Sequence, residues 1–254
     1  MTTPINLLNQ NYRVAYEGWL TLSDSGDVAR FGPISTTTSG TDVASYNRIF
    51  ALDAVPRDEI EAAAEWMDRR GLPFCLITTD ERRAEAEEIA TSFGLVESKH
   101  TEPGMVLPWL ESIPDQSSDA SIEVVSDGDT LDAMSEVFTT EFGFPVELAR
   151  YFIPSAAVNE ESMTYLVGRI DGQIVSTGAL ISHDDGAGIY LVGTIEDYRG
   201  RGIATDITRE LLRLGRDGGC QFGVLQSTEM GYSVYKNMGF EPVVEYHMFK
   251  WPSE

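Results

Sequence analysis

The feature that most restricts the fold of this chain is a near-continuous apolar run, Ile189–Ile195. It precedes a glycine pair, Gly200 and Gly202, and an amphipathic stretch over residues 203–216. Such a run is typical of a strand covered on both faces, and the apolar residues after the glycines recur at helical spacing. The order strand, tight turn, helix is common where helices cover a sheet. The sequence therefore predicts an α/β fold.

The turn before this predicted helix has the properties of a phosphate-binding site. Glycine accepts positive φ and lets a ligand approach the backbone, and the free N–H groups at a helix start attract anions. A Walker loop needs a lysine after its last glycine, where Ile203 stands. A dinucleotide-binding fingerprint needs a third glycine, where Thr205 stands. The remaining pattern is Arg-x-x-Gly-x-Ala over 199–204. The alternative is a packing turn with solvated arginines.

Together with a second motif, this turn resembles that of the GNAT superfamily of N-acetyltransferases. The family has an Arg/Gln-x-x-Gly-x-Gly/Ala loop, and Arg199, Gly202 and Ala204 stand at its positions. Downstream, segment 230–240 ends in Tyr-x-x-x-Gly-Phe and is similar to the family's helix after the next strand. The resemblance extends over about residues 121–251. It implies acetyl-CoA as co-substrate, with its pyrophosphate at the turn.

The chain reads as two similar halves joined by a linker over 108–121, which is rich in Pro, Asp and Ser. We interpret this as a degenerate duplication: two GNAT-like domains in tandem, residues 1–110 and 120–254, each a central mixed sheet flanked by helices. Chance similarity of two α/β units is the alternative. The N-terminal half shows a strand (46–52), a helix (57–70), a strand (73–78), a helix (81–93) and an extended segment ending at 105–107. The C-terminal half shows a strand (121–126), helices (131–151), a hairpin (163–182), a strand (189–195), a helix (203–216), a strand (221–227), a helix (231–238) and a last pair of strands.

The N-terminal half lacks the residues that carry the resemblance. Residues 53–58, which follow its strand, contain no glycine, and Ala90 stands where the tyrosine would be. This half resembles the cofactor-free half of tandem GNAT proteins, so we expect it to bind no acetyl-CoA. It would form one side of the acceptor pocket or stabilise the pair of domains.

The resemblance also implies roles for single residues. Tyr235 matches the family tyrosine that protonates the leaving thiolate, and transfer from a phenol to a thiolate is uphill by about 2 kcal/mol with unperturbed groups. Backbone groups of the interrupted strand would hold the pantetheine arm and the thioester carbonyl. Thr228 stands where many members carry Asn. The predicted cofactor-binding residues are Val192, Gly193, Thr194, Arg199, Gly200, Arg201, Gly202, Ile203, Ala204, Thr205 and Thr228.

The predicted reaction is direct attack of a primary amine, of a small molecule or a peptide, on the thioester. No nucleophile–base pair is visible in the sequence, so we expect no acyl-enzyme. The general base stays open between Glu196, Glu229 and water. We expect no metal, because the three histidines show no ligand spacing. The acceptor cleft would involve Phe142, Phe144, Tyr151 and Phe152, although a packed core explains them equally well. The alternative functions are a non-catalytic acyl-CoA-binding sensor or regulatory protein, and a scaffold without a ligand.

The composition adds limits on partners and environment. The net charge is −23, the pI is about 4.3, and only three of the 18 basic residues are lysines. This halophilic-type surface suggests a high-salt cytoplasm, where self-repulsion is screened, although an acidic mesophilic protein is possible. We expect no nucleic acid, no membrane span and no secretory signal, and hence a cytoplasmic protein, monomer or homodimer. Cys75 and Cys220 are expected to be buried, reduced thiols.

Overall fold

The computed structural model describes residues 3–111, 113–143 and 146–252. Over these residues twelve strands form one mixed sheet, in the order β1-β2-β3-β4-β12-β6-β11-β10-β9-β8-β7, with β5 beside β12. The strands are β1 (Asp27–Phe31), β2 (Ile34–Thr38), β3 (Asn47–Ala51), β4 (Cys75–Thr79), β5 (Val96–Glu97), β6 (Glu102–Leu107), β7 (Ser121–Val124), β8 (Met163–Ile170), β9 (Gln173–His183), β10 (Gly186–Thr194), β11 (Phe222–Gln226) and β12 (Glu241–Lys250).

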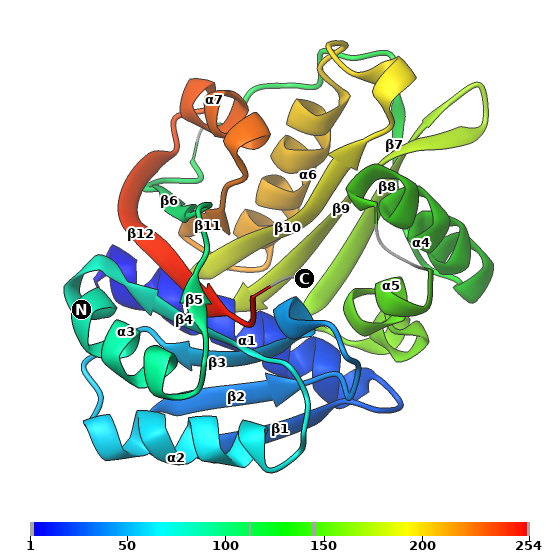
Figure 1. Ribbon diagram of the computed structural model, residues 1–254. Coiled ribbons are helices and arrows are strands. Elements are labelled where there is room, and N and C mark those ends of the chain that lie inside the picture. Colours follow the sequence, from blue (N-terminus) through cyan, green and yellow to red (C-terminus); the bar gives the residue numbers. More distant parts are fainter. Residues whose placement is uncertain (1–2, 112, 144–145, 253–254) are drawn as a thin grey trace.

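Helices cover both faces of this sheet, so the molecule has three layers (Figure 1). One face carries α1, α4 and α5, and the other carries α2, α3, α6 and α7. The near-continuous apolar character of β10 follows from this, since α1 and α6 pack on its opposite faces. The helices are α1 (Pro4–Leu22), α2 (Arg57–Asp68), α3 (Arg83–Ser92), α4 (Gly128–Phe142), α5 (Val146–Phe152), α6 (Ile203–Asp217) and α7 (Glu229–Asn237).

The two halves of the chain share the sheet, and each gives its last long strand to the other. Strand β12, from the C-terminal half, pairs with β4, and β6, from the N-terminal half, pairs with β11. The two exchanged strands pair with each other at the centre. The order β1-β2-β3-β4-β12 thus mirrors β8-β9-β10-β11-β6. A separate sheet in each half is therefore not observed, and the division at residues 110 and 120 stays a prediction.

Helix α1, which the sequence analysis did not predict, ties the N-terminal half to the strands of the C-terminal half. Asn11 is fully buried; its amide donates to the carbonyls of Ile181 (2.9 Å) and Gly186 (3.3 Å), and its oxygen accepts from the Tyr190 hydroxyl (2.7 Å). The approach is so close that a Cβ at Gly188 would lie 1.9 Å from the Asn11 oxygen. Halves that share such contacts are not independent packing units.

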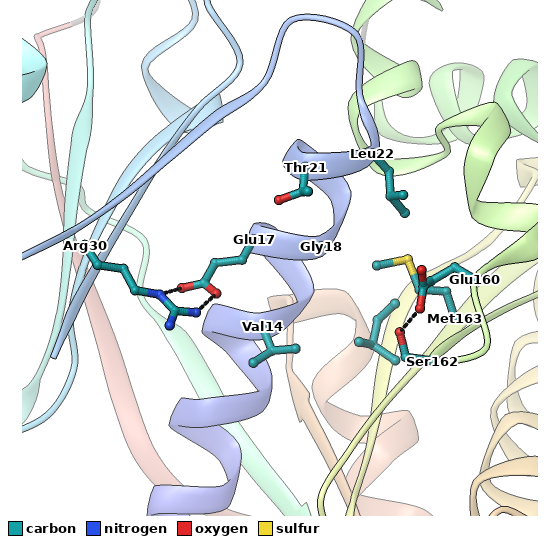
Figure 2. A pocket seen from close by; sticks show the side chains of 10 residues that line it. Val14, Glu17, Gly18, Thr21, Leu22, Arg30, Glu160, Ser162 and Met163 are labelled. Carbon is teal, nitrogen blue, oxygen red and sulfur yellow. Dashed lines mark hydrogen bonds and ion pairs between the residues drawn. The ribbon is translucent and has the colours of Figure 1, made fainter.

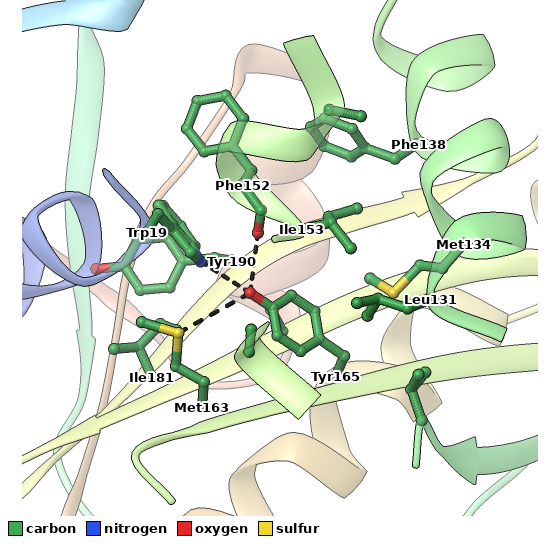
Figure 3. Packing of buried hydrophobic residues seen from close by; sticks show 14 of the residues in the cluster. Trp19, Leu131, Met134, Phe138, Phe152, Ile153, Met163, Tyr165, Ile181 and Tyr190 are labelled. Carbon is green, nitrogen blue, oxygen red and sulfur yellow. Dashed lines mark hydrogen bonds between the residues drawn. The ribbon is translucent and has the colours of Figure 1, made fainter. Parts of the chain in front are cut away.

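Aromatic rings fill the core between α1, α4, α5 and the sheet (Figure 3). The Trp19 indole donates to the Tyr165 hydroxyl (3.0 Å), which donates in turn to the Phe152 carbonyl (2.9 Å). Trp19 also meets Phe152 and Tyr190 edge-on, with ring centroids 5.2 Å apart in both pairs. The buried polar ends of Trp19 and Tyr165 thus both have partners, as such rings require.

Most predicted elements are confirmed to within a few residues, with three differences. The last pair of strands predicted for the C-terminal half is the single strand β12, which carries a register shift between Pro242 and Val244. The sequence analysis also missed α1 and the hairpin of β1 and β2. Both cysteines are free and buried, as predicted.

Candidate functional site

The site is built where two parallel strands part. Pairing of β10 with β11 ends at Gly188 and Val224, although β11 continues along β6 to Gln226. Residues 189–194 of β10 therefore have no ladder partner on their β11 side among the described residues. We call this stretch the β10–β11 opening. Unpaired main-chain groups beside it are available to an extended ligand.

A bulge shapes the β10 side of this opening. The register with β9 shifts between Tyr190 and Gly193, and Leu191 between them has φ of 54°. A left-handed residue other than glycine is strained and persists only where its surroundings hold it. Gly193, one of the predicted cofactor-binding residues, resumes the pairing after the bulge, opposite Thr177.

The glycine turn opens α6 as the sequence predicts. Gly200 and Gly202 have φ of 75° and 81°, in the left-handed region that favours glycine. Gly202 is the N-cap and offers no side-chain hydrogen bond, so no cap competes for the first N–H groups of α6, at Ile203, Ala204 and Thr205. A Cβ at Gly200 would meet no described atom within 4 Å. The turn fits a diphosphate, because it has donors, a helix start and open space.

The two arginines of the turn differ in their surroundings. The Arg199 Nε donates to the Thr194 carbonyl (3.1 Å), which links the turn to the end of β10. Arg201 forms an ion pair with Asp119 of the linker (2.7 Å) and lies over the Tyr198 ring. The Asp119 carboxylate is thus the partner of Arg201, an arginine that the sequence predicts to bind phosphate.

The linker lies against the start of α6 and is held there by a buried acid. The Asp206 carboxylate, 1% exposed, accepts from the backbone N–H groups of Ser117 (2.9 Å) and Ser118 (2.6 Å) and forms an ion pair with Arg209. Burial raises the pKa of Asp206, but these hydrogen bonds prevail and hold it below its usual value. The sequence analysis did not single out Asp206. A signal was present in the sequence, because Asp206 stands on the apolar side of an amphipathic helix, where a buried charge needs partners.

Tyr235 lies on α7, partly buried and edge-on to Phe240, with ring centroids 5.8 Å apart. Burial raises the pKa of Tyr235 to about 12. A proton moved from this phenol to a thiolate of pKa about 8.5 would go uphill by about 5 kcal/mol, against about 2 kcal/mol for unperturbed groups. The raised pKa makes this phenol a weaker acid, which favours a role as hydrogen-bond donor over full proton transfer.

The remaining predicted residues are Thr228, the two candidate general bases and the aromatic residues of the predicted acceptor cleft. The Thr228 hydroxyl caps α7 by accepting from the Gly231 N–H (3.1 Å). Glu196 and Glu229 are exposed. Tyr151 and Phe152 pack in the aromatic core, Phe152 being 6% exposed. Phe144 and the side chain of Phe142 lie outside the described residues.

The corresponding place in the N-terminal half is closed. Strands β3 and β4 stay paired up to Ala51 and Thr78, where β3 ends, and the Thr78 hydroxyl donates to the Ala51 carbonyl (3.1 Å). Next to this end, the Arg82 guanidinium donates to the Val55 carbonyl (2.6 Å). At this place, which the structure describes throughout, the N-terminal half thus presents neither an opening nor a glycine turn.

A pocket of about 370 Å³ lies elsewhere, beside α1 (Figure 2). Glu17, held by Arg30, lines one side, and Ser162, bonded to Glu160, lines the other. It shares no residue with the predicted site. Over 3–111, 113–143 and 146–252, no cluster of His, Cys, Asp and Glu could hold a metal ion, and no helix is both long and apolar enough for a bilayer.

Residues 131–240, less than half of the chain, match the model of the Acetyltransferase (GNAT) family. They include most of α4, the bulge, the glycine turn and Tyr235. A comparison with curated proteins found no match.

Solved structures are similar over nearly the whole chain. A GCN5-related N-acetyltransferase from Kribbella flavida is 17% identical, with a TM-score of 0.70, over 97% of this chain and 96% of that one. A tandem GNAT protein from the clavulanic acid biosynthesis pathway, described without AcCoA, is 14% identical, with a TM-score of 0.63, over 100% and 90%. A GCN5-related N-acetyltransferase from Sphaerobacter thermophilus is 17% identical, with a TM-score of 0.60, over 89% and 75%.

At these identities the structural likeness shows the fold alone. The family match over residues 131–240 and these neighbours support a GNAT acetyltransferase domain in that part of the chain. This supports acyl transfer in general. The acyl donor, the acceptor and the residue roles are matters of proposal.

Proposed function

We propose that this protein is an acetyl-CoA-dependent N-acetyltransferase that acts on a primary amine by direct attack. The observation that carries the proposal is the juxtaposition of the β10–β11 opening with the uncapped start of α6. The opening offers main-chain groups to a pantetheine arm, and the turn offers N–H groups to a diphosphate. Arg199 and Arg201 add positive charge beside it.

In the proposed reaction a neutral amine forms a C–N bond with the thioester carbon, and the C–S bond breaks. Negative charge that develops on the carbonyl oxygen is stabilised by N–H groups of β10 around Val192. The amine proton leaves to Glu196, to Glu229 or to water. The thiolate accepts a hydrogen bond from the Tyr235 phenol, which is protonated at neutral pH.

Turnover and affinity, measured separately, test this role of Tyr235. The Tyr235→Phe variant should lower kcat at least tenfold with a panel of amines, since removal of one aligned donor costs about 10²-fold or more. The dissociation constant for CoA should change less than about threefold, because the phenol does not reach the diphosphate. The matched control is Tyr232→Phe, on the same helix.

The outcomes distinguish the functions. Unchanged turnover in Tyr235→Phe contradicts the role of the phenol. Binding of acetyl-CoA without turnover of any amine by the wild type would favour a non-catalytic acyl-CoA-binding protein. Absence of a thermal shift with CoA at low and at high salt would contradict both.

A further inference from the structure

Three consecutive residues of β9 face the bulge of β10. Ser176, Thr177 and Gly178 form a small, polar interruption in a strand whose other central residues are apolar, and both hydroxyl residues are 0% exposed. Buried hydroxyls require partners. Here the partners are carbonyls of the bulge.

Each hydroxyl holds one carbonyl of β10. The Thr177 hydroxyl donates to the Leu191 carbonyl (2.8 Å), and the Ser176 hydroxyl donates to the Gly193 carbonyl (2.7 Å). Because the Ser176 hydroxyl donates its only proton to the Gly193 carbonyl, the Thr194 hydroxyl is the donor in the 2.9 Å contact between the two hydroxyls. Both carbonyls are thus drawn towards β9.

This fixes the direction of the amides that follow. In a trans peptide the C=O and the N–H point in opposite directions, and the described chain contains no cis bond. With the Leu191 carbonyl held towards β9, the N–H of Val192 points to the β11 side. The same holds for the N–H of Thr194, because the Gly193 carbonyl is held towards β9. Both amides therefore face the β10–β11 opening.

The third residue, Gly178, brings α6 against the same point. A Cβ there would lie 2.5 Å from a methyl carbon of Ile207 and 3.0 Å from one of Leu211. Only glycine lets α6 lie directly on β9 opposite the bulge. The segment 176–178 thus contacts both parts of the site, the bulge and the helix with the glycine turn.

We propose that Ser176 and Thr177 are positioning residues for acyl transfer: Thr177 aims the amide of Val192 at the thioester carbonyl, and Ser176 turns the amide of Thr194 into the same opening, towards the pantetheine arm. The inference rests on the proposed function and deepens it. Neither side chain reaches the opening itself; each acts through a carbonyl of β10. The strained φ of Leu191 persists because the Thr177 hydroxyl and the resumed pairing at Gly193 hold the loop between them.

The test is Thr177→Val, which keeps the shape of the side chain and removes the hydroxyl. We expect kcat with a saturating amine to fall at least tenfold and the dissociation constant for CoA to stay within about twofold, because a misaligned oxyanion donor affects the transition state first. Thr177→Ser restores the donor and should recover most of kcat. The control is Thr78→Val, which removes an equally buried hydroxyl that donates to a strand carbonyl of the other half.

An NMR measurement on the ligand-free protein separates this inference from the proposed function. In Thr177→Val, the amide signal of Val192 should shift and exchange faster with solvent, while signals of α6 stay in place. A kcat loss no greater than that of Thr78→Val, or equal losses in kcat and CoA affinity, would overturn the positioning role. If the wild type turned over no amine, the proposed function would fail. The positioning role would then be supported by acetyl-CoA shifting the Val192 amide in the wild type but not in Thr177→Val, and overturned if both shifted alike.

Discussion

The substitution Asn11→Leu tests whether the two halves form one cooperative unit. The variant removes two donated hydrogen bonds and leaves the Tyr190 hydroxyl without its acceptor, all in fully buried surroundings. An unpaired buried hydroxyl costs about 1–3 kcal/mol and each lost net hydrogen bond about 0.5–1.5 kcal/mol, so we expect a loss near 3 kcal/mol. For a chain of this length, that lowers the melting temperature by about 6 °C.

Differential scanning calorimetry is the assay, and Asn6→Leu is the control, because Asn6 is exposed on the same helix. The control should stay within about 0.5 kcal/mol of the wild type. Wild type and Asn11→Leu should each unfold in one transition, since α1 belongs to the cores of both halves. Two separate transitions, of which the variant moves only one, would refute this reasoning.

A double-mutant cycle with Tyr190→Phe isolates the bond between the two side chains. Tyr190→Phe alone leaves the Asn11 oxygen without its hydroxyl donor, whereas the double variant has already lost both groups. The double variant should therefore lose less stability than the sum of the losses in the two single variants, by about 1 kcal/mol or more. Additive losses would show that the contact contributes nothing.

Two further predictions concern charge. The Arg83 guanidinium lowers the pKa of Glu97 to about 2, below its unfolded value of about 4.3, so the stability that the ionised carboxylate gives is present above pH 4.3 and disappears as pH falls through 2. The melting temperature of Glu97→Gln should therefore fall less than that of the wild type between pH 5 and 2, by the equivalent of less than about 1 kcal/mol because the pair is partly exposed. Identical profiles of melting temperature against pH would contradict this. Asp119→Asn frees Arg201 for the diphosphate and should tighten CoA binding up to about fivefold by titration calorimetry, whereas unchanged affinity would mean that Arg201 does not meet the ligand.

The sequence predicts much of the C-terminal half because its signals are local. The strand over Phe222–Gln226 has the predicted bounds almost to the residue, and the positive φ of Gly200 and Gly202 follows from glycine's freedom at a turn. The hairpin turn at Asp171 and Gly172 is equally local, and both residues have positive φ as the Asp-Gly pair indicates.

The features that the sequence does not predict depend on contacts between distant segments. The exchange of β6 and β12 joins residues far apart in the chain, so no local pattern reveals it. The bulge at Leu191 is accompanied by a hydrogen bond from the Thr177 hydroxyl across the ladder, and leucine itself gives no sign of a left-handed conformation. Helix α1 could have been found, because Leu8, Tyr12, Ala15 and Trp19 recur at helical spacing and are all buried.

The most direct test of the central claim is a crystal structure of the protein with acetyl-CoA. The account predicts the diphosphate against the N–H groups of Gly200–Thr205, the pantetheine arm along residues 189–194, and the sulfur beside Tyr235. A diphosphate bound at the start of α2, or at the pocket beside α1, would contradict the assignment of the site.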